Sequence, residues 1–368
     1  NRRSLALLAL CLPILLLLVG CPKTEPPTPS TAGPLPSTSA ATPSSPDAGE
    51  TIEIAMIPKL VGIDFFNACE RGAKEAAEEL PGVELVFDGP TEASVEGQVE
   101  MIENYTDRGV DVIAVACNDP NAVADSLKRA VDKGITVITW DSDADAAASG
   151  RAFFVNQVRA RDLAETLVDE MARQAGEDAN IVIVSSTPNA TNQNTWIKHM
   201  REYMAEVYPG MKEAADVLYP GEDQAAATMA TQDVLKANPS INGVFGLSSN
   251  ACPGAAQAVV DAGRHTEVSV VGLGTPKAMR AWVDRGEIGS TVLWDAVQLG
   301  YLTVHVAQAV ARGELGPDAE SFAAGRLGEV AVEGDVVVLG KPVVFTKENI
   351  ADYGGDADHP LAGIAFQR

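Results

Sequence analysis

The chain has 368 residues, of which 46% are hydrophobic and 21% charged, an ordinary globular composition that excludes a disordered polymer. At about 100–200 residues per domain, this length predicts two domains that each bury a core. The 51 Asp and Glu residues outnumber the 27 Lys and Arg residues, which gives a formal net charge of −24. No nucleic acid is expected as a partner, because the field of so acidic a protein repels a polyanion.

Residues 1–20 have the pattern of a signal peptide. Arg2 and Arg3 precede an apolar run over residues 5–19, which is too short to span a membrane comfortably. The run ends in Leu-Val-Gly-Cys, which resembles a bacterial lipobox and implies that Cys21 is acylated. The alternative is an uncleaved membrane helix. We therefore predict a lipoprotein in the periplasm or at the outer cell surface, which contacts the membrane only through its lipid anchor.

A tether and a tail flank the part that is expected to fold. Residues 21–50 comprise Cys21 and a stretch of eight Pro, five Ser and five Thr residues. Because the stretch has few apolar side chains, burial cannot offset the conformational entropy that the chain would lose on ordering. We therefore predict a proline-stiffened tether. Residues 354–368 are predicted to form a tail.

From residue 51 onward, short apolar runs alternate with amphipathic stretches, a βαβ pattern that predicts parallel sheets covered by helices. The first set of strands is expected at 52–57, 83–87, 112–116, 136–140 and 152–155, with helices at 65–80, 95–108 and 122–133. The second set of strands is expected at 181–185, 217–219, 243–247, 268–272 and 291–293, with helices at 193–207, 225–237, 254–262 and 276–285. Two similar five-strand halves predict an α/β protein with two doubly wound domains.

Familiar catalytic and cofactor motifs do not occur. The chain has no Gly-x-Ser-x-Gly motif, and the Gly-Leu-Gly of residues 272–274 lacks the remaining glycine of a dinucleotide fingerprint. Residues 141–152 begin like a calcium loop but lack its glycine and its final glutamate. Cys69, Cys117 and Cys252 are interpreted as buried small hydrophobic residues, because no Cys-x-x-Cys occurs. We therefore predict no catalytic residues, no cofactor and no metal.

Ligands of doubly wound sheets bind outside the carboxyl ends of strands, and with two sheets the expected site is the cleft between them. The residues there combine carboxylates, amides, an ammonium group and aromatic rings, which suits a polyol whose hydroxyls donate and accept while its C–H faces lie on the rings. The candidate ligand-binding residues are Lys59, Phe65, Phe66, Asn118, Asp141, Asn192, Gln193, Ser249, Asn250, Trp294 and Asp295.

Each main candidate also has a structural interpretation. Lys59 would then be a solvated lysine at a strand end, and Asp141 would cap a turn. Phe65 and Phe66 would be core residues. In the same way, Asn192 would cap the next helix and Trp294 would pack at a hinge. The joint placement of these residues at strand ends favours the ligand-binding hypothesis.

Several blocks resemble the type I periplasmic sugar-binding proteins, and most closely the autoinducer-2-binding and rhamnose-binding branch. These blocks are Ile57-Pro58-Lys59-Leu60-Val61-Gly62 with Phe65-Phe66, Asp88-Gly89-Pro90-Thr91-Glu92, Thr139-Trp140-Asp141-Ser142-Asp143, Asn192-Gln193-Asn194 and Leu293-Trp294-Asp295. The resemblance covers about residues 51–353. It implies two Rossmann-like lobes with a three-strand hinge that close on a monosaccharide, and a protein that delivers this ligand to an ABC permease.

The resemblance also implies roles for individual residues. Lys59, Asp141 and Gln193 match a lysine, an aspartate and a glutamine that hold the ligand in autoinducer-2 binders. Asn192 stands where those binders have aspartate, and residues 247–249 replace their Pro-Asp-Ala loop. The Thr-Asn-Gln-Asn block of residues 191–194 is more similar to the rhamnose-binding branch. The expected ligand is therefore a rhamnose-like sugar or an autoinducer-2-like furanose.

By the same resemblance, the chain crosses between the lobes near Asn156, Trp294 and Ala323. This gives an N-terminal lobe of residues 51–156 plus 295–323 and a C-terminal lobe of residues 157–294 plus 324–353. We expect a monomer. A ligand-sensing module for a chemoreceptor or sensor kinase is the alternative function, and an enzyme that acts on the same sugar is a third hypothesis.

Overall fold

The computed structural model describes residues 51–353. The predicted signal peptide, Cys21, the tether and the tail lie outside these residues. Within the described part of the chain, none of the helices combines the length and the apolar character needed to cross a membrane.

The first sheet has eight strands in the order β11-β12-β13-β5-β4-β3-β1-β2. The strands are β1 (Ile52–Ile57), β2 (Val83–Phe87), β3 (Val112–Val115), β4 (Thr136–Trp140), β5 (Phe153–Val158), β11 (Ser321–Ala323), β12 (Glu329–Glu333) and β13 (Val336–Gly340). Neighbouring strands from β13 to β2 are parallel, while β11 and β12 form an antiparallel edge. The carboxyl ends of the parallel strands therefore share one edge of the sheet.

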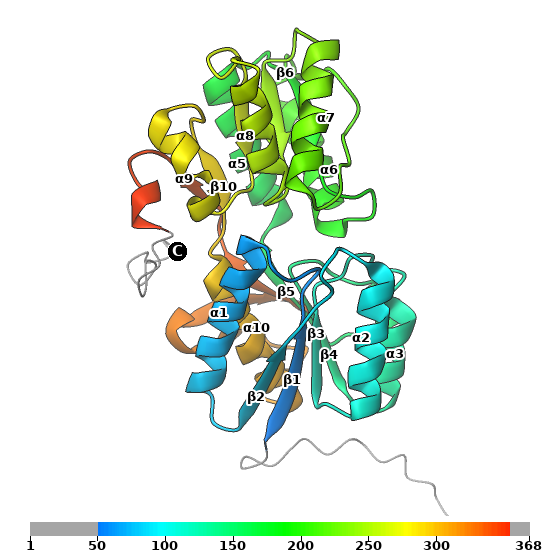
Figure 1. Ribbon diagram of the computed structural model, residues 1–368. Helices are drawn as coiled ribbons and strands as arrows, with labels where there is room; N and C mark the ends of the chain where they lie inside the picture. Colours follow the sequence, from blue (N-terminus) through cyan, green and yellow to red (C-terminus); the bar gives the residue numbers. More distant parts are fainter. Residues whose placement is uncertain (1–50, 354–368) are drawn as a thin grey trace, which may run out of the picture. The chain divides into compact units, whose positions relative to one another are not determined.

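Helices cover both faces of this sheet (Figure 1). On one face lie α1 (Asp64–Glu79) and α10 (Ala296–Ala311), and on the other lie α2 (Val95–Arg108) and α3 (Ala124–Asp132). Side chains of β1 alternate between the two cores: Ile54 and Met56 join the larger one, and Ile57 joins that of α2 and α3. The helices α1 and α10 approach so closely that a Cβ atom on Gly300 would lie 1.9 Å from the carbonyl oxygen of Cys69.

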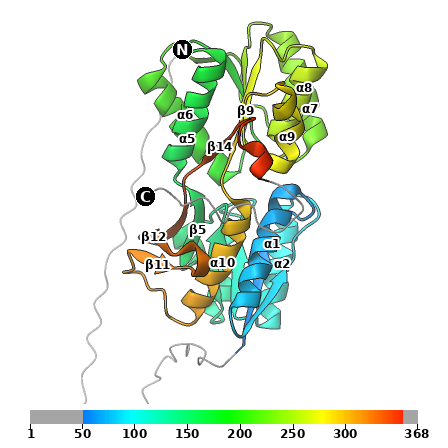
Figure 2. The ribbon, with the colours of Figure 1, turned by 90° about the vertical axis from the view of Figure 1, so that its left-hand side faces the viewer.

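The second sheet has four parallel strands in the order β7-β6-β8-β9. They are β6 (Asn180–Val184), β7 (Lys212–Glu213), β8 (Gly243–Gly246) and β9 (Ser269–Gly272). The helices around it are α5 (Ala160–Ala175), α6 (Thr191–Val207), α7 (Gln224–Ala237), α8 (Ala251–Asp261) and α9 (Pro276–Arg285). Figure 2 shows α5 and α6 on one side and α7 and α8 on the other. The short elements α4 (Ala146–Ser149), η1 (Gly325–Leu327) and η2 (Ile350–Asp352) complete the described fold.

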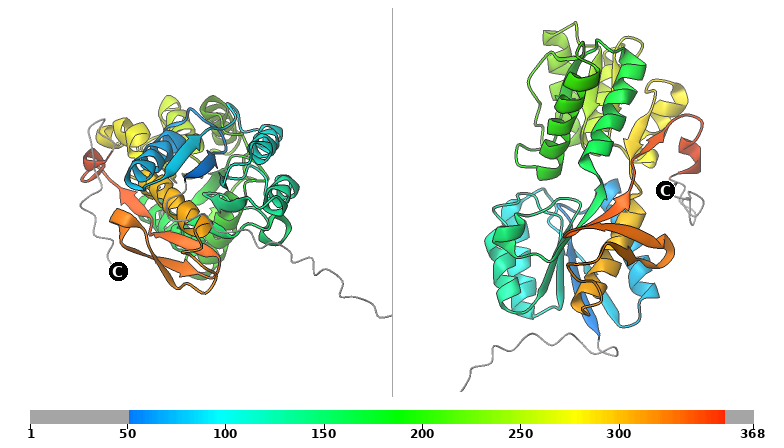
Figure 3. Two further views of the ribbon diagram at one scale, coloured as in Figure 1. Left: turned by 90° about the horizontal axis from the view of Figure 1, so that it is seen from below. Right: turned by 180° about the vertical axis from the view of Figure 1, so that it is seen from behind.

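The chain passes three times between the part built on the first sheet and the part built on the second, which we call the first and second lobes. The passages run from β5 to α5, from β10 (Thr291–Leu293) to α10, and from β13 to β14 (Val343–Phe345). Strands β10 and β14 pair with each other as a separate antiparallel ribbon, visible from behind in Figure 3. The two-lobed α/β fold expected from the sequence is confirmed.

The expectation of two five-strand halves is wrong, because the sheets have eight and four strands. The strand expected at 217–219 is reduced to a single bridge between Val184 and Leu218. The assignment of residues 324–353 to the C-terminal lobe is also wrong in part: β12 and β13 belong to the first sheet. Since β13 buries Val337 and Leu339 on the edge of β5, the third passage comes after Gly340 rather than near Ala323.

Candidate ligand-binding site

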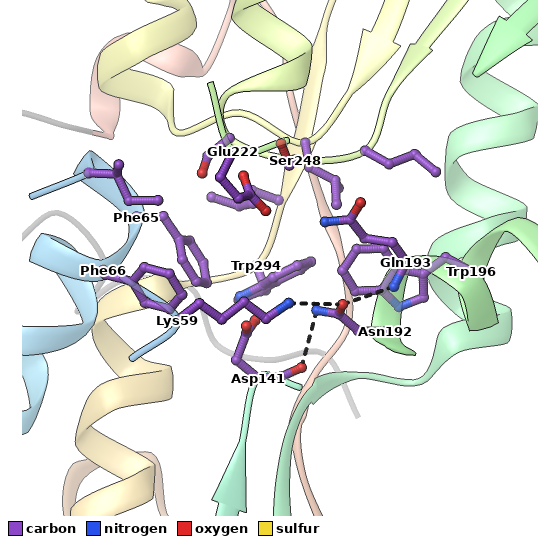
Figure 4. A pocket seen from close by; sticks show the side chains of 15 residues that line it. Lys59, Phe65, Phe66, Asp141, Asn192, Gln193, Trp196, Glu222, Ser248 and Trp294 are labelled. Carbon is purple, nitrogen blue, oxygen red and sulfur yellow. Dashed lines mark hydrogen bonds between the residues drawn. The ribbon is translucent and has the colours of Figure 1, made fainter. Parts of the chain in front are cut away.

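Loops from the carboxyl ends of both sheets enclose a cavity of about 40 Å³ (Figure 4). The first lobe contributes Lys59 after β1, Asp141 after β4, and Phe65 and Phe66 at the start of α1. The second lobe contributes loops after β6, β7 and β8. The complete lining is Lys59, Ile63, Phe65, Phe66, Asp141, Asn192, Gln193, Trp196, Glu222, Leu247, Ser248, Ser249, Leu273, Leu293 and Trp294.

Asn192 joins the two lobes through hydrogen bonds to the first-lobe loops. The Lys59 Nζ donates to Asn192 Oδ1 at 3.3 Å, and Asn192 Nδ2 donates to the carbonyl oxygen of Asp141 at 3.4 Å. The position of Lys59 is itself fixed, because Asn118 Nδ2 donates to its carbonyl oxygen at 2.9 Å. Only 5% of Lys59 is exposed, so its ammonium group is held inside the pocket rather than in solvent.

Asp141 has an unusual backbone and a perturbed carboxyl group. It is the one non-glycine residue of the described chain with a positive φ, at +57°, where L-residues are sterically strained. Burial raises the pKa of Asp141 to about 6, Lys59 opposes this shift and the charge of Glu222 adds to it. Among residues 51–353, no donor bonds the carboxylate itself, so its acceptor capacity is available to a ligand.

The loop that carries Asp141 is held by a buried arginine. Arg151 donates from Nε and Nη2 to the two carboxylate oxygens of Asp143, at 2.8 and 2.6 Å. Its remaining nitrogen, Nη1, donates to Asp335 in the β12–β13 turn at 2.6 Å. A planar guanidinium suits this forked contact. The first lobe thus fixes the strained loop from two sides.

Aromatic rings form a continuous wall of the pocket. The Trp294 ring lies 5.8 Å from that of Phe65 and 5.7 Å from that of Trp196, and Phe65 contacts Phe66 at 5.1 Å. The indole Nε1 of Trp294 is buried and has no acceptor among the described residues. This wall offers apolar faces for C–H groups together with one free donor.

In the second lobe, two more polar groups are oriented by their neighbours. Gln193 Oε1 accepts from Ser185 Oγ at 2.5 Å and from the Ser186 N–H at 2.8 Å. The Gln193 Nε2 therefore remains as its donor. Asn250 Nδ2 donates to the carbonyl oxygen of Glu222 at 3.2 Å and to its Oε2 at 3.4 Å.

Of the eleven residues predicted from the sequence, the structure brings eight into the pocket lining: Lys59, Phe65, Phe66, Asp141, Asn192, Gln193, Ser249 and Trp294. Asn118, Asn250 and Asp295 do not line it. Asn118 and Asn250 support Lys59 and Glu222, as described above. Asp295 caps α10 by accepting from the N–H groups of Val297 and Gln298 at 3.0 and 3.1 Å, and burial raises its pKa to about 6.

Three structural interpretations can be settled as well. Phe65 and Phe66 belong to the hydrophobic core and also line the pocket. The interpretation of Asn192 as a helix cap is wrong, because α6 begins at Thr191 and the cap position is Ala190. The interpretation of the three cysteines is confirmed, since Cys69, Cys117 and Cys252 are free and buried.

The set of candidates omitted several lining residues, above all Glu222 and Trp196. Glu222 follows the stretch 217–219, so the strand-end rule that found Asp141 would have found Glu222 had it been applied there. Trp196 lies one helical turn beyond Asn192, a spacing that places both on one face of α6. No cluster of three or more potential metal ligands occurs among residues 51–353.

The fold and pocket define a class of protein. The family model for the periplasmic binding protein domain matches residues 54–315. The chain therefore belongs to the periplasmic binding proteins, and its relatives are sugar-binding solute-binding proteins of ABC transporters. The ribose import binding protein of Escherichia coli is 25% identical over 263 residues, which cover 71% of this chain and 85% of the relative.

Several solved structures are similar as well. A sugar ABC transporter protein from Actinomyces odontolyticus is 34% identical with a TM-score of 0.67, covering 83% of this chain and 98% of that one. A solute-binding protein from Clostridium phytofermentas with bound L-rhamnose is 29% identical with a TM-score of 0.77, covering 82% and 98%. LsrB from Clostridium saccharobutylicum in complex with AI-2 is 27% identical with a TM-score of 0.77, covering 83% and 100%.

Proposed function

We propose that this protein is the substrate-binding lipoprotein of an ABC sugar importer, and that it captures a rhamnose-like sugar or an autoinducer-2-like furanose between its lobes. The observation that carries the proposal is the set formed by the buried Lys59 and Asp141 and the half-buried Asn192, which faces the wall of Phe65 and Trp294. L-Rhamnose and AI-2 are the ligands of two similar structures, which supports this choice of ligand class.

The polar groups of the pocket match the needs of a hydroxyl-rich ligand. Asp141 and Glu222 accept hydrogen bonds, while Lys59, the Gln193 amide and the Trp294 indole donate them. A hydrogen bond to a charged group contributes about 1.5–3 kcal/mol. The aromatic wall then covers the apolar face of the sugar ring.

Binding requires the pocket to open. A cavity of about 40 Å³ holds only a few water molecules, whereas small-molecule pockets usually measure about 300–1,000 Å³. A ligand would therefore enter when the loops around Asn192 separate from Lys59 and Asp141. Closure would then replace the hydrogen bonds of Asn192 to these two residues by bonds to the ligand.

The remaining parts of the proposal follow from the leader sequence and the family. Cys21 would carry the lipid that anchors a monomer to the membrane, and the closed lobes would present their edges to the permease. No nucleic acid, cofactor or catalytic step is part of this function.

Isothermal titration of the purified protein with L-rhamnose, D-ribose and AI-2 tests the proposal. We expect saturable binding of at least one of them with one site per chain. Quenching or enhancement of tryptophan fluorescence should accompany it, because Trp196 and Trp294 line the pocket. If none of these three ligands binds, the proposed function is contradicted.

A further inference from the structure

Glu222 is the one carboxylate that the second lobe contributes to the pocket lining. It lies between β7 and α7 in a loop whose backbone is fixed on both sides. The N–H of Gly221, a residue with φ of +80°, donates to the carbonyl oxygen of Ser186 at 2.8 Å. On the other side, Asp223 caps α7 by accepting from the Ala226 N–H at 2.8 Å.

The Glu222 side chain is oriented without being neutralised. Asn250 donates a 3.4 Å hydrogen bond to its Oε2. No Lys, Arg or His of the described chain forms an ion pair with Glu222, whereas twenty-one such pairs occur elsewhere in residues 51–353. An ionised carboxylate offers about four acceptor sites. Since Asn250 uses one of these sites, the others are open to a ligand or to water.

The charges of the pocket are arranged unevenly. Figure 4 shows Lys59 beside Asp141 and Asn192 on one side, and Glu222 with Ser248 on the other. The lining contains two carboxylates and a single ammonium group. Lys59 offsets the charge of Asp141 beside it, so no cation of the lining remains for Glu222, and its side of the pocket retains a negative charge next to apolar walls.

From this arrangement we propose that Glu222 determines specificity by selecting ligands with hydrogen-bond donors on its side of the pocket. Hydroxyl and ammonium groups satisfy its free acceptor sites. A carboxylate or phosphate placed there would face a like charge and leave both groups without a donor. The pocket would accordingly accept neutral or amine-bearing sugars and reject sugar acids and sugar phosphates. This inference rests on the proposed function.

The test compares Glu222→Gln with Asp223→Asn by isothermal titration of whichever of L-rhamnose, D-ribose and AI-2 the wild type binds. Both substitutions remove one negative charge from the same loop, but Asp223 does not line the pocket and asparagine caps helices as well as aspartate does. We expect Glu222→Gln to weaken binding by at least about tenfold, because a charged acceptor is lost, and Asp223→Asn to change it by less than about twofold. Thermal denaturation of both variants checks that they fold.

A competition experiment adds a second criterion. The wild type is first loaded with the neutral sugar that it binds, and D-galacturonate is then added at the concentration at which that sugar saturates the protein. We expect D-galacturonate not to displace the bound sugar. Equal affinities of Glu222→Gln and Asp223→Asn, or displacement by D-galacturonate from the wild type, would overturn the role of Glu222 and leave the proposed function intact. Failure of the wild type to bind any of the three neutral ligands would overturn both.

Discussion

The two lobes supply the pocket with polar groups of different kinds. Lys59 and Asp141 of the first lobe are at most 5% exposed and lie at the carboxyl ends of the interior strands β1 and β4 of the eight-stranded sheet. Glu222 and Ser249 of the second lobe are partly exposed and lie on loops around a four-stranded sheet. The first lobe would thus contact a ligand through buried charged groups, whereas the second lobe combines the buried Gln193 and Ser248 with Glu222 and Ser249, which keep some contact with water.

This difference predicts which residues of the pocket lower the free energy of unfolding. The first lobe holds Asp141 with a left-handed backbone and with a carboxyl group that burial makes harder to ionise. Strain and desolvation of this kind gather at functional sites because they prepare a site for its ligand. Substitutions in the first lobe should therefore change both affinity and stability, whereas Glu222 should affect affinity alone.

The largest effect is expected for Asp141→Ala. The substitution removes a buried carboxylate that would make two or more charge-assisted hydrogen bonds to the ligand, a loss of about 3–6 kcal/mol. Binding should fall by more than about a hundredfold in isothermal titration. Asp132→Ala, on the exposed end of α3, is the control and should bind normally. Unchanged affinity of the Asp141 variant would mean that the ligand binds elsewhere.

Asp141→Asn should raise stability although it weakens binding. The pKa of about 6, against an ordinary 3.8, means that ionised Asp141 destabilises the folded state at pH 7 by about 3 kcal/mol. Asparagine removes this cost and tolerates positive φ. The gain in unfolding free energy, measured with urea, should be full above the folded pKa of about 6, shrink as the pH falls, and disappear only below the unfolded pKa of 3.8, where Asp141 is protonated in both states of the wild type. A less stable variant at pH 7 would contradict this account.

The sequence was sufficient to predict the first-lobe side of the pocket, because Lys59 and Asp141 follow strands whose apolar runs are clear. Glu222 was not among the candidates, although a strand is predicted at 217–219 just before it. In the structure this stretch makes only one bridge, between Val184 and Leu218, and Glu222 lies in the irregular loop that follows. A local pattern identifies residues at the end of a strong strand better than residues in an irregular loop.

Long-range pairing explains the remaining errors. Residues 336–340 were assigned to the second lobe, but their apolar side chains complete the first sheet by pairing with β5, far away in the sequence. Such pairing depends on which edge is free, which no local pattern reveals. In contrast, α5 carries a recognisable helical spacing in Leu163, Leu167 and Met171, and it was omitted although local information was sufficient.

Trp294→Phe tests the aromatic wall between the two polar sides. Phenylalanine retains a ring next to Phe65 but loses the unpartnered Nε1 donor. We expect affinity for the neutral sugar to fall by about threefold to tenfold, the value of one neutral hydrogen bond. Trp140→Phe is the matched control, because Trp140 packs behind Phe66 and does not line the pocket. Equal losses in both variants would show that packing, rather than the indole donor, sets the affinity.

An effect no larger than that of Trp294→Phe is expected for Asn192→Asp, which changes the residue that connects the lobes. Aspartate keeps an oxygen for Lys59 but cannot donate to the carbonyl oxygen of Asp141, where Asn192 Nδ2 lies at 3.4 Å. It also restores the carboxylate expected in autoinducer-2 binders. The ratio of AI-2 affinity to L-rhamnose affinity should therefore rise by about threefold to tenfold in parallel titrations, which corresponds to the free energy of one hydrogen bond. A ratio that stays constant would show that Asn192 acts only in joining the lobes, and that the choice between the two ligands is made by the second lobe's loops around Glu222 and Ser249.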